Sequence, residues 1–324
     1  MNKTRLTIIL SILLNLLLIP VIAQPLTKDK PNSSYAPLIW VDAGANLDRT
    51  ATRPDIADIL DRCVDSGFKT VILDVKPGSG LVIYPSKIAP RLLEWRGKKI
   101  DPNYDRLKIF IEEGHKRDLK IMAAFFVFSE GHHIYKVGPI YTNHPEWQAQ
   151  ILTKDGIKPI TEVPGKTAKV NPSNPDIQKY ELSIIEEVIR NYAVDGVILD
   201  GVRYDSLYTD FSDISKKEFI KYLLANGKKT DALRNWPGAI MEWGPKPADI
   251  KKGPLYDDWL LFRAKTIYDF MVKARKLVKD TNPKLAFGDY AGAWYPSYYE
   301  VGVNWGSQKY SPPKDWAPKG WGKY

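Results

Sequence analysis

The amino-acid sequence predicts an α/β fold, a TIM-type (β/α)8 barrel of which about five βα units are visible. Short, fully apolar strands alternate with amphipathic helices, a pattern typical of a parallel sheet that is covered on both faces. No G-x-G-x-x-G motif follows the first strand, which counts against the competing architecture, an open doubly wound dinucleotide-binding sheet. The strands end instead in carboxylates, and polar residues at the carboxyl ends of several strands indicate a barrel active site.

The individual elements follow from local patterns. Strands are predicted at 38–41 and 70–73, where short apolar runs end in acidic residues. Between them, Thr52 and Asp55 have the spacing of a capping box, and Gly67 is typical of the residue that follows a helix. The remaining predicted elements are a helix at 104–111, a strand at 120–128, a helix opened by Asn174-Pro175, a strand at 194–199, helices about 214–224 and 256–278, and a strand at 284–287.

The number of strands predicts an incomplete barrel. Closure of a (β/α)8 barrel needs eight strands, whereas five are recognisable here. Residues 295–324 are too rich in Pro and Gly for a sixth strand. We therefore expect a barrel domain at 38–324 that is shortened at its C-terminus and marginally stable or prone to aggregation.

The N-terminus has the pattern of an export signal. Within residues 1–23, Lys3 and Arg5 precede an apolar stretch, and Ala23 is a small residue suited to cleavage. An uncleaved anchor helix is the alternative, but the apolar stretch is short for a span of ~20 residues. A polar, Pro-rich linker follows at 24–37. We expect a periplasmic or extracellular protein with no stable membrane anchor after cleavage.

Composition excludes several classes of function. The chain has 47 Lys and Arg against 38 Asp and Glu, a net charge of +9, but no basic helix interleaved with aromatic residues, so we expect no nucleic-acid partner. One cysteine, Cys63, excludes a disulfide framework. Of the four histidines, His132 and His133 are adjacent and cannot form an i, i+4 metal pair. We predict neither a metal site nor a cofactor.

Asp200 is the strongest candidate for a catalytic residue. It ends the fourth predicted strand, in the run Asp200-Gly201-Val202-Arg203-Tyr204. Arg203 is expected to keep Asp200 ionised by lowering its pKa through the opposite-charge effect. Arg203 and Tyr204 are also expected to contact substrate. The structural alternative is that Asp200 only caps its loop or pairs with Arg203.

Two further acids are candidates for a partner of Asp200. Asp289 ends the fifth predicted strand, and Glu130 lies just past the third. In a barrel the ends of the fourth and fifth strands are neighbours, so Asp200 and Asp289 could flank one bond. Glycoside hydrolysis needs such a pair, one to protonate the leaving oxygen and one to attack or to activate water. The alternatives are a hydrogen bond from Asp289 to its own turn and a mobile loop position for Glu130.

Substrate-binding residues are expected at the other strand ends and in the loops. Asp42 and Asp74 are predicted to bind sugar hydroxyls, and Lys76 to neutralise Asp74, with a structural ion pair as the alternative. Flat tryptophan rings bind the apolar faces of sugar rings, so the cleft is expected to contain two or three of the tryptophans outside regular elements, Trp294 among them. Packing of the loops is the alternative for each of the tryptophans outside regular elements, which are Trp95, Trp147, Trp236, Trp243, Trp294, Trp305, Trp316 and Trp321.

Three segments carry a resemblance to a known family: VNPSNP at 170–175, DGVILDGVRY at 195–204 and FVFSEGH at 126–132. Together they resemble the glycosyl-hydrolase-like family 10, bacterial (β/α)8 glycoside hydrolases near the α-amylase branch, over about residues 36–310. By this similarity, Asp200 matches the fourth-strand aspartate that is the nucleophile in α-amylases. The resemblance implies an exported glycoside hydrolase that cleaves O-glycosidic bonds of a polysaccharide or glycan with two carboxylates. A non-catalytic glycan-binding protein on the same scaffold is the alternative.

Overall fold

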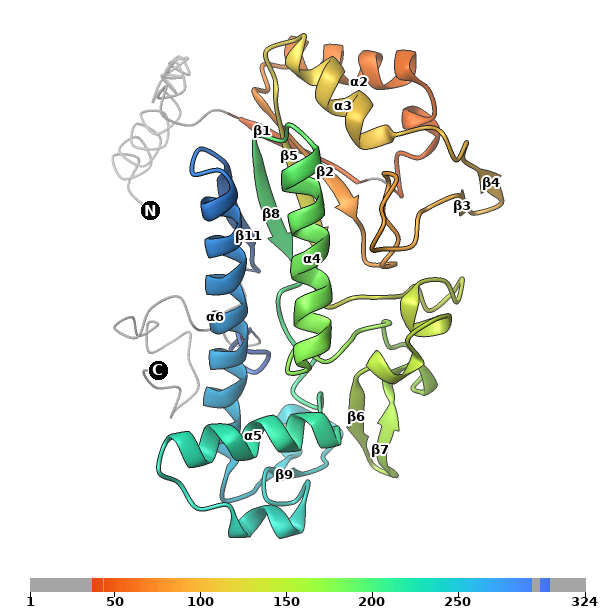
Figure 1. Ribbon diagram of the computed structural model, residues 1–324. Helices are drawn as coiled ribbons and strands as arrows, with labels where there is room; N and C mark the ends of the chain where they lie inside the picture. Colours follow the sequence, from red (N-terminus) through yellow and green to blue (C-terminus); the bar gives the residue numbers. More distant parts are fainter. Residues whose placement is uncertain (1–36, 43, 293–297, 304–324) are drawn as a thin grey trace, which may run out of the picture. The chain divides into compact units, whose positions relative to one another are not determined.

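A five-stranded parallel sheet forms the centre of the protein. The computed structural model describes residues 37–42, 44–292 and 298–303, which lie in a compact unit spanning Pro37–Tyr324 (Figure 1). The predictions for residues 1–23, for 24–36 and for Trp294 lie outside the described residues. The strands, in chain order and in sheet order, are β1 (Leu38–Val41), β2 (Thr70–Lys76), β5 (Lys120–Phe126), β8 (Gly196–Asp200) and β11 (Ala286–Tyr290).

The topology of this sheet is that of a TIM barrel. Each strand pairs in parallel with the next along the chain, with no reversal of order such as an open doubly wound sheet has. All five predicted strands are confirmed, with bounds that shift by three residues or fewer at each end. Among the described residues the sheet is not closed, so β1 and β11 are its two edges.

The helices begin where the sequence predicts. α2 (Arg53–Asp65) has the expected capping box, because the Asp55 amide donates to the Thr52 side chain and the Thr52 amide donates to the Asp55 carboxylate. In α4 (Pro175–Asn191), the Asn174 side chain accepts from the amide of Asp176, and proline occupies the first turn. The other helices are α3 (Arg106–His115), α5 (Asp213–Ala225) and α6 (Tyr256–Thr281).

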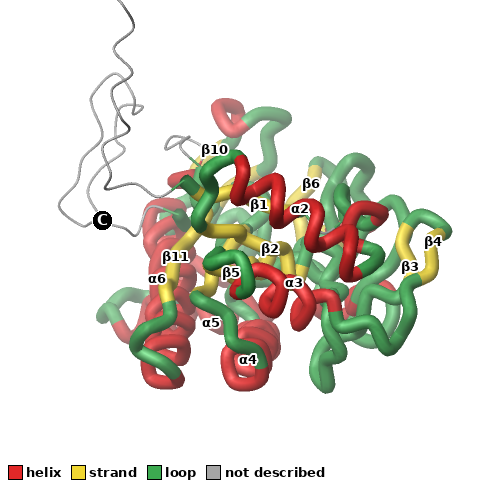
Figure 2. The backbone as a smooth tube through the Cα atoms, turned by 90° about the horizontal axis from the view of Figure 1, so that it is seen from above, coloured by secondary structure: helices red, strands yellow, loops and turns green. Residues whose placement is uncertain are grey.

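The helices cover one face of the sheet. Alternate strand residues such as Val71, Ile121 and Val197 are fully buried, and they share one core cluster with apolar residues of α2, α3, α4 and α6. α4 and α6 pack against each other and lie side by side in both backbone views (Figure 2). None of the helices that the structure describes is long and apolar enough to span a membrane.

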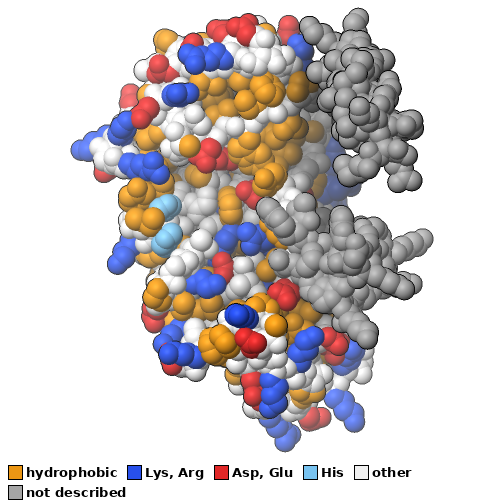
Figure 3. All heavy atoms as spheres, turned by 180° about the vertical axis from the view of Figure 1, so that it is seen from behind, with side chains coloured by type: hydrophobic (Ala, Val, Ile, Leu, Met, Phe, Trp, Pro, Cys, Tyr) orange, Lys and Arg blue, Asp and Glu red, His pale blue; other side chains and the backbone are white. Residues whose placement is uncertain are grey.

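Within the described part of the chain, the opposite face of the sheet is only partly covered. Seen from behind, this side of the molecule carries a broad gathering of hydrophobic side chains (Figure 3). Leu38 and Tyr290, at the two edges, are 56% and 62% exposed, and Met122 and Ile198 on the inner strands are half-buried. The rings of Trp40 and Tyr290 are 5.2 Å apart, so the sheet curls until residues of its two edge strands touch. This is the face that a closed barrel fills with side chains.

The loops around the main sheet contain a second apolar cluster and several short elements. A second apolar cluster, with Trp259 and Phe219 fully buried, joins α5 and the start of α6 to the loops around them. In the loops that the structure describes, two-stranded ribbons are formed by β3 (Glu94–Trp95) with β4 (Lys98–Lys99), by β6 (Gln150–Thr153) with β7 (Gly156–Pro159), and by β9 (Met241–Glu242) with β10 (Lys251–Lys252). The 3-10 helices are Asp48–Thr50, Pro139–Tyr141, Pro145–Trp147, Ile160–Glu162, Asp231–Asn235 and Pro247–Asp249.

A buried lysine at the end of β2 connects three elements. The Lys76 ammonium is fully buried, and it forms ion pairs with Glu130, in the loop after β5, and with Glu181 of α4. It also donates to the carbonyl oxygen of Phe126 at 2.8 Å. The prediction that Lys76 neutralises Asp74 is therefore wrong. The register between β2 and β5 shifts between Asp74 and Lys76, so Lys76 pairs with the buried Phe125, and its ammonium reaches the acids of α4 and of the β5 loop.

The two acids of this cluster compete for one counter-charge. Burial and the neighbouring Glu181 raise the pKa of Glu130 well above its ordinary value, against the lowering effect of Lys76. The Glu181 carboxylate in turn accepts from the amide of Phe128 at 3.0 Å. The cluster of Lys76, Glu130 and Glu181 therefore fixes the backbone of the loop that follows β5.

Replacing Lys76 by Met removes the ammonium and keeps an unbranched side chain of nearly the same length. We expect the free energy of unfolding to fall by about 3–5 kcal/mol, because both acids lose their buried counter-charge. Denaturant unfolding followed by circular dichroism measures this. In the matched control, Lys158→Met, the lost ammonium is 41% exposed, and we expect a change of at most about 1 kcal/mol. Equal losses in the two variants would contradict a structural role for Lys76.

Candidate active site

Asp200 and Asp289 lie together at the carboxyl ends of the last two strands. The parallel register of β8 and β11 pairs Asp200 with Tyr290 and Leu199 with Asp289, so the two acids are one step apart along neighbouring strands. Both line a cavity of about 220 Å³, with Phe126, Arg203 and Tyr298 in its wall. The structure thus brings together the two carboxylates that the sequence predicted as a pair.

Asp200 is partly buried, and its surroundings have opposing effects on its pKa. Burial raises its pKa, and this effect outweighs the hydrogen bond from the Gly201 amide and the charges of Lys169 and Arg203, which lower it. The prediction that Arg203 lowers the pKa of Asp200 below its ordinary value is wrong in its net direction. Arg203 instead donates to the carbonyl oxygen of Tyr204 and lies over the ring of Tyr298.

Asp289 is the acid of the pair that holds a proton more readily. Burial, and then the neighbouring charge of Asp200, raise the pKa of Asp289 to about 6. Two carboxyl groups that face one cavity do not ionise independently, because the first charge disfavours the second. Below pH 6 Asp289 is therefore the site of the pair that burial and repulsion favour for a proton.

Two candidates prove to be fully buried. Glu130, a predicted acid, has a side chain with 0% exposure and belongs to the cluster with Lys76. Tyr204, predicted to contact substrate, is also 0% exposed; its hydroxyl is 2.5 Å from that of Ser173, and the guanidinium of Arg263 lies 4.3 Å from its ring centre. Neither side chain is part of the cavity wall, and both make buried contacts with neighbouring segments.

The predicted substrate-binding residues are divided among several places. Asp42 is exposed and lines a second cavity, of about 440 Å³, at the ends of β1, β2 and β5. Asp74 accepts a hydrogen bond from the indole of Trp40 at 2.6 Å. Of the tryptophans expected to bind sugar, Trp95 lines the second cavity, whereas Trp147 is buried and stacks on His144.

Sequence analysis did not identify Lys169 as a functional residue. This lysine is 4% exposed, lines the second cavity, and lies with its Nζ atom 4.0 Å from the ring centre of Phe126. Phe126 lines both cavities, so its ring stands between them. The only signal in the sequence is that Lys169 directly precedes the Val170–Pro175 motif, which does not reveal that the residue is buried beside Asp200.

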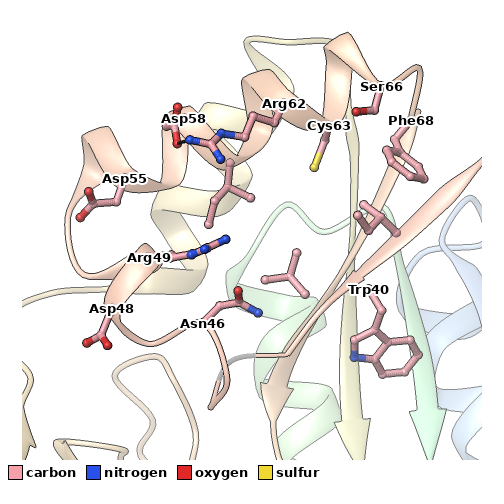
Figure 4. Close-up of a pocket in the computed structure, with 13 residues that line it drawn as sticks. Trp40, Asn46, Asp48, Arg49, Asp55, Asp58, Arg62, Cys63, Ser66 and Phe68 are labelled. Carbon is pink, nitrogen blue, oxygen red and sulfur yellow. Dashed lines mark ion pairs between the residues drawn. The ribbon is translucent and has the colours of Figure 1, made fainter.

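The most voluminous of the cavities described here is not the candidate site. It measures about 470 Å³ and lies between β1 and α2, on the outer side of the sheet edge (Figure 4). Its charged side chains include Arg49 and the Asp58–Arg62 ion pair of 2.8 Å, which lies within one helix. No strand-end carboxylate lines it, so it lacks the chemistry of the smaller cavity. The described part of the chain also holds no group of three or more His, Cys, Asp or Glu suited to a metal ion.

The raised pKa of Asp289 predicts a pH-dependent stability. The folded protein disfavours the ionised form of Asp289. The contribution of the protonated Asp289 to the free energy of unfolding is therefore fully present below its ordinary pKa of 3.8 and is lost as the pH rises through about 6. Asp289→Asn stays neutral throughout. We expect the variant to gain stability relative to the parent between pH 4 and pH 7, by on the order of 2 kcal/mol. Denaturant unfolding across this range measures the difference, and parallel curves for the two proteins would contradict the assignment.

The chain is similar in sequence to known proteins. Over 187 residues, 55% of this chain, it is 32% identical to glycosyl hydrolase DigH of Escherichia coli (strain K12), and it spans 40% of that protein. It is 34% identical over 291 residues to an S-layer-related protein of Niallia circulans, covering 84% of this chain and 18% of that relative. The chain thus spans less than half the length of these relatives.

The fold has a counterpart among solved structures. The glycoside hydrolase domain of PgaB (BpsB) from Bordetella bronchiseptica superimposes with a TM-score of 0.53 at 17% sequence identity, over 78% of this chain and 64% of that domain. This likeness supports the TIM-barrel type of α/β fold. The family described as Glycosyl hydrolase-like 10 matches residues 37–310, and the chain therefore belongs to that family.

Proposed function

We propose that this protein is an exported glycoside hydrolase that cleaves O-glycosidic bonds of a polysaccharide or glycan with two carboxylates. The observation that carries the proposal is the placement of Asp200 and Asp289 in one cavity at the carboxyl ends of neighbouring strands. Membership of a glycosyl hydrolase-like family supports a glycan as the substrate.

The electrostatics of the pair suggest a division of roles. Asp289, with a pKa raised to about 6, keeps a proton in mildly acidic conditions and can donate it to the glycosidic oxygen as the bond breaks. Asp200 lies near the charges of Lys169 and Arg203, which favour its ionised form. As a carboxylate it can stabilise the positive charge that develops on the sugar, and either attack the anomeric carbon or activate a water molecule.

The neighbouring cavity gives the substrate a place to extend. The two cavities share the Phe126 ring, and the larger one carries Trp95 and Asp42 in its wall. An aromatic ring beside polar groups suits a sugar, whose faces are apolar and whose edge carries hydroxyls. In this proposal a glycan binds across both cavities, with the scissile bond at Asp200 and Asp289.

Replacing Asp200 by Asn keeps the volume of the side chain and removes its charge. We expect the release of reducing ends from a cleaved glycan to fall by at least about 10³-fold, because the developing positive charge loses its counter-charge. Assays on a glycan panel measure this, with circular dichroism to show that the variant folds. Asp155→Asn, the same change in an exposed hairpin, is the control and should keep parental activity. Near-parental turnover by Asp200→Asn would refute the assignment.

The same panel separates the enzyme from a non-catalytic glycan-binding protein. A hydrolase shortens the glycan, whereas a binding protein retards its migration and leaves its length unchanged. Retardation without new reducing ends, at any pH from 4 to 8, would replace the proposed hydrolase by the binding function.

Export is the second part of the proposal. It rests on the basic, apolar and small residues in residues 1–23. We expect cleavage after Ala23, so that the exported protein begins at Gln24. N-terminal sequencing of protein recovered outside the cytoplasm measures this, and exported material that still begins at Met1 would indicate an anchor in place of a signal.

A further inference from the structure

The larger cavity beside the carboxylate pair is lined by aromatic and charged side chains from several loops. It has a volume of about 440 Å³, and its wall combines the loop after β2 with the β3–β4 ribbon and the loop after β5. The side chains that matter for its chemistry are Asp42, Trp95, Arg96, His132, His133 and Lys169. Three of them carry aromatic rings, and the ring of Trp95 meets that of His132 edge to face at 5.1 Å.

Two buried donors in this wall have no acceptor. The Nζ atom of Lys169 and the Nε1 atom of Trp95 are both shielded from solvent, and neither has a hydrogen-bond partner within the described protein. A buried donor without a partner costs about 1–3 kcal/mol, and more when it is charged. Buried donors without a partner are rare in native proteins. A ligand with oxygen acceptors would satisfy both donors when it binds in the cavity.

Charge narrows the choice of ligand. Arg96 and Lys169 contribute two cationic groups to the lining, whereas Asp42 is its one carboxylate among the described residues. The Oδ1 atom of Asp42 already accepts from the amide of Ala45 at 2.6 Å. Asp205 also acts on Lys169, but it pairs with Lys166 at 3.5 Å. The lining of the cavity therefore carries more positive than negative charge.

The pKa of Lys169 also supports an anionic ligand in this cavity. Burial, then the charge of Arg203, lower the pKa of Lys169 to about 7, against the opposing effects of Asp205 and Asp200. An anion bound at the Nζ atom would favour the charged form and offset this effect. The backbone holds the side chain in place, because Lys169 pairs with Ser129 of the loop after β5 in an antiparallel bridge.

We propose that this cavity is a subsite for a sugar unit that carries an anionic substituent, a carboxylate or a sulfate, which accepts hydrogen bonds from the Lys169 ammonium and the Trp95 indole. The inference rests on the proposed function, since it makes an acidic glycan the preferred substrate of the site at Asp200 and Asp289. The Phe126 ring separates the two cavities, so the charged unit would occupy the position beside the one that is cleaved.

Binding to paired glycans tests the subsite. The probes are oligogalacturonate, its carboxyl-reduced neutral counterpart, and a sulfated galactan with its desulfated form. Calorimetry at pH 6 uses the Asp289→Asn protein, in which turnover is suppressed and Asp200 remains beside Lys169. We expect at least one charged glycan to bind about 10- to 100-fold more tightly than its neutral counterpart, as for a hydrogen bond to a charged group. The charged probe that binds identifies carboxylate or sulfate as the recognised group.

Matched variants assign this preference to the cavity. Lys169→Met should reduce it to within about threefold, whereas Lys158→Met, which removes an exposed lysine, should leave it unchanged. If Lys169→Met fails to fold, the Arg96→Asn variant tests whether cationic residues of the cavity cause the preference. Arg96 lies in an exposed turn with φ of 53°, which asparagine tolerates, so this variant should fold. It should lower the preference at least threefold.

Each outcome separates this inference from the proposed function. Equal affinity for charged and neutral glycans, or a preference that survives Lys169→Met and Arg96→Asn, would overturn the anionic subsite. Cleavage of neutral glycans alone would overturn the subsite and keep the hydrolase. Tight binding of acidic glycans that the parent protein never shortens would keep the subsite and overturn the hydrolase, and a panel with no binding at all would overturn both.

Discussion

The burial of Lys76 between Glu130 and Glu181 is the constraint on which the geometry of the site depends. An ammonium with no exposure is stable only if its charge is matched, and here the matching acids come from the loop after β5 and from α4. The same ammonium donates to the carbonyl oxygen of Phe126. The end of β5 is thereby fixed to β2 and α4, so the Phe126 ring keeps its place between the two cavities.

The carboxylate pair shows how the fold sets the chemistry of two identical side chains. Asp200 and Asp289 both end strands, yet nearby cations oppose the effect of burial on Asp200, whereas the influences on Asp289 all favour its protonated form. Environments that differ in this way assign the roles of acid and carboxylate. Lys169 affects both cavities, since it acts electrostatically on Asp200 and presents a donor without a partner to the neighbouring hollow.

Among the described residues, one face of the sheet stays partly open because the sheet does not close into a barrel. In a closed barrel the inward side chains of alternate strands fill the interior in layers. Here the corresponding side chains include Met122 and Ile198, which are half-buried, and Tyr290 at the edge, which is 62% exposed. The contact between Trp40 and Tyr290 brings residues of the two edge strands together near the carboxyl ends. Burial raises the pKa values of both carboxyl groups of the pair.

The sequence by itself determined the order and type of the main elements, because apolar periodicity, the Thr52–Asp55 capping box and strand-end carboxylates are local signals. It also predicted that Asp200 and Asp289 lie together, since parallel strands end at one edge of a sheet. Only the tertiary structure decided which charged residues pair with one another. Glu130 meets Lys76 and Glu181, which lie 54 and 51 positions away in the chain, and Lys169 reaches the site from an isolated bridge with Ser129 outside the main sheet. Burial and long-range pairing depend on the packing of distant segments, and no local pattern encodes them.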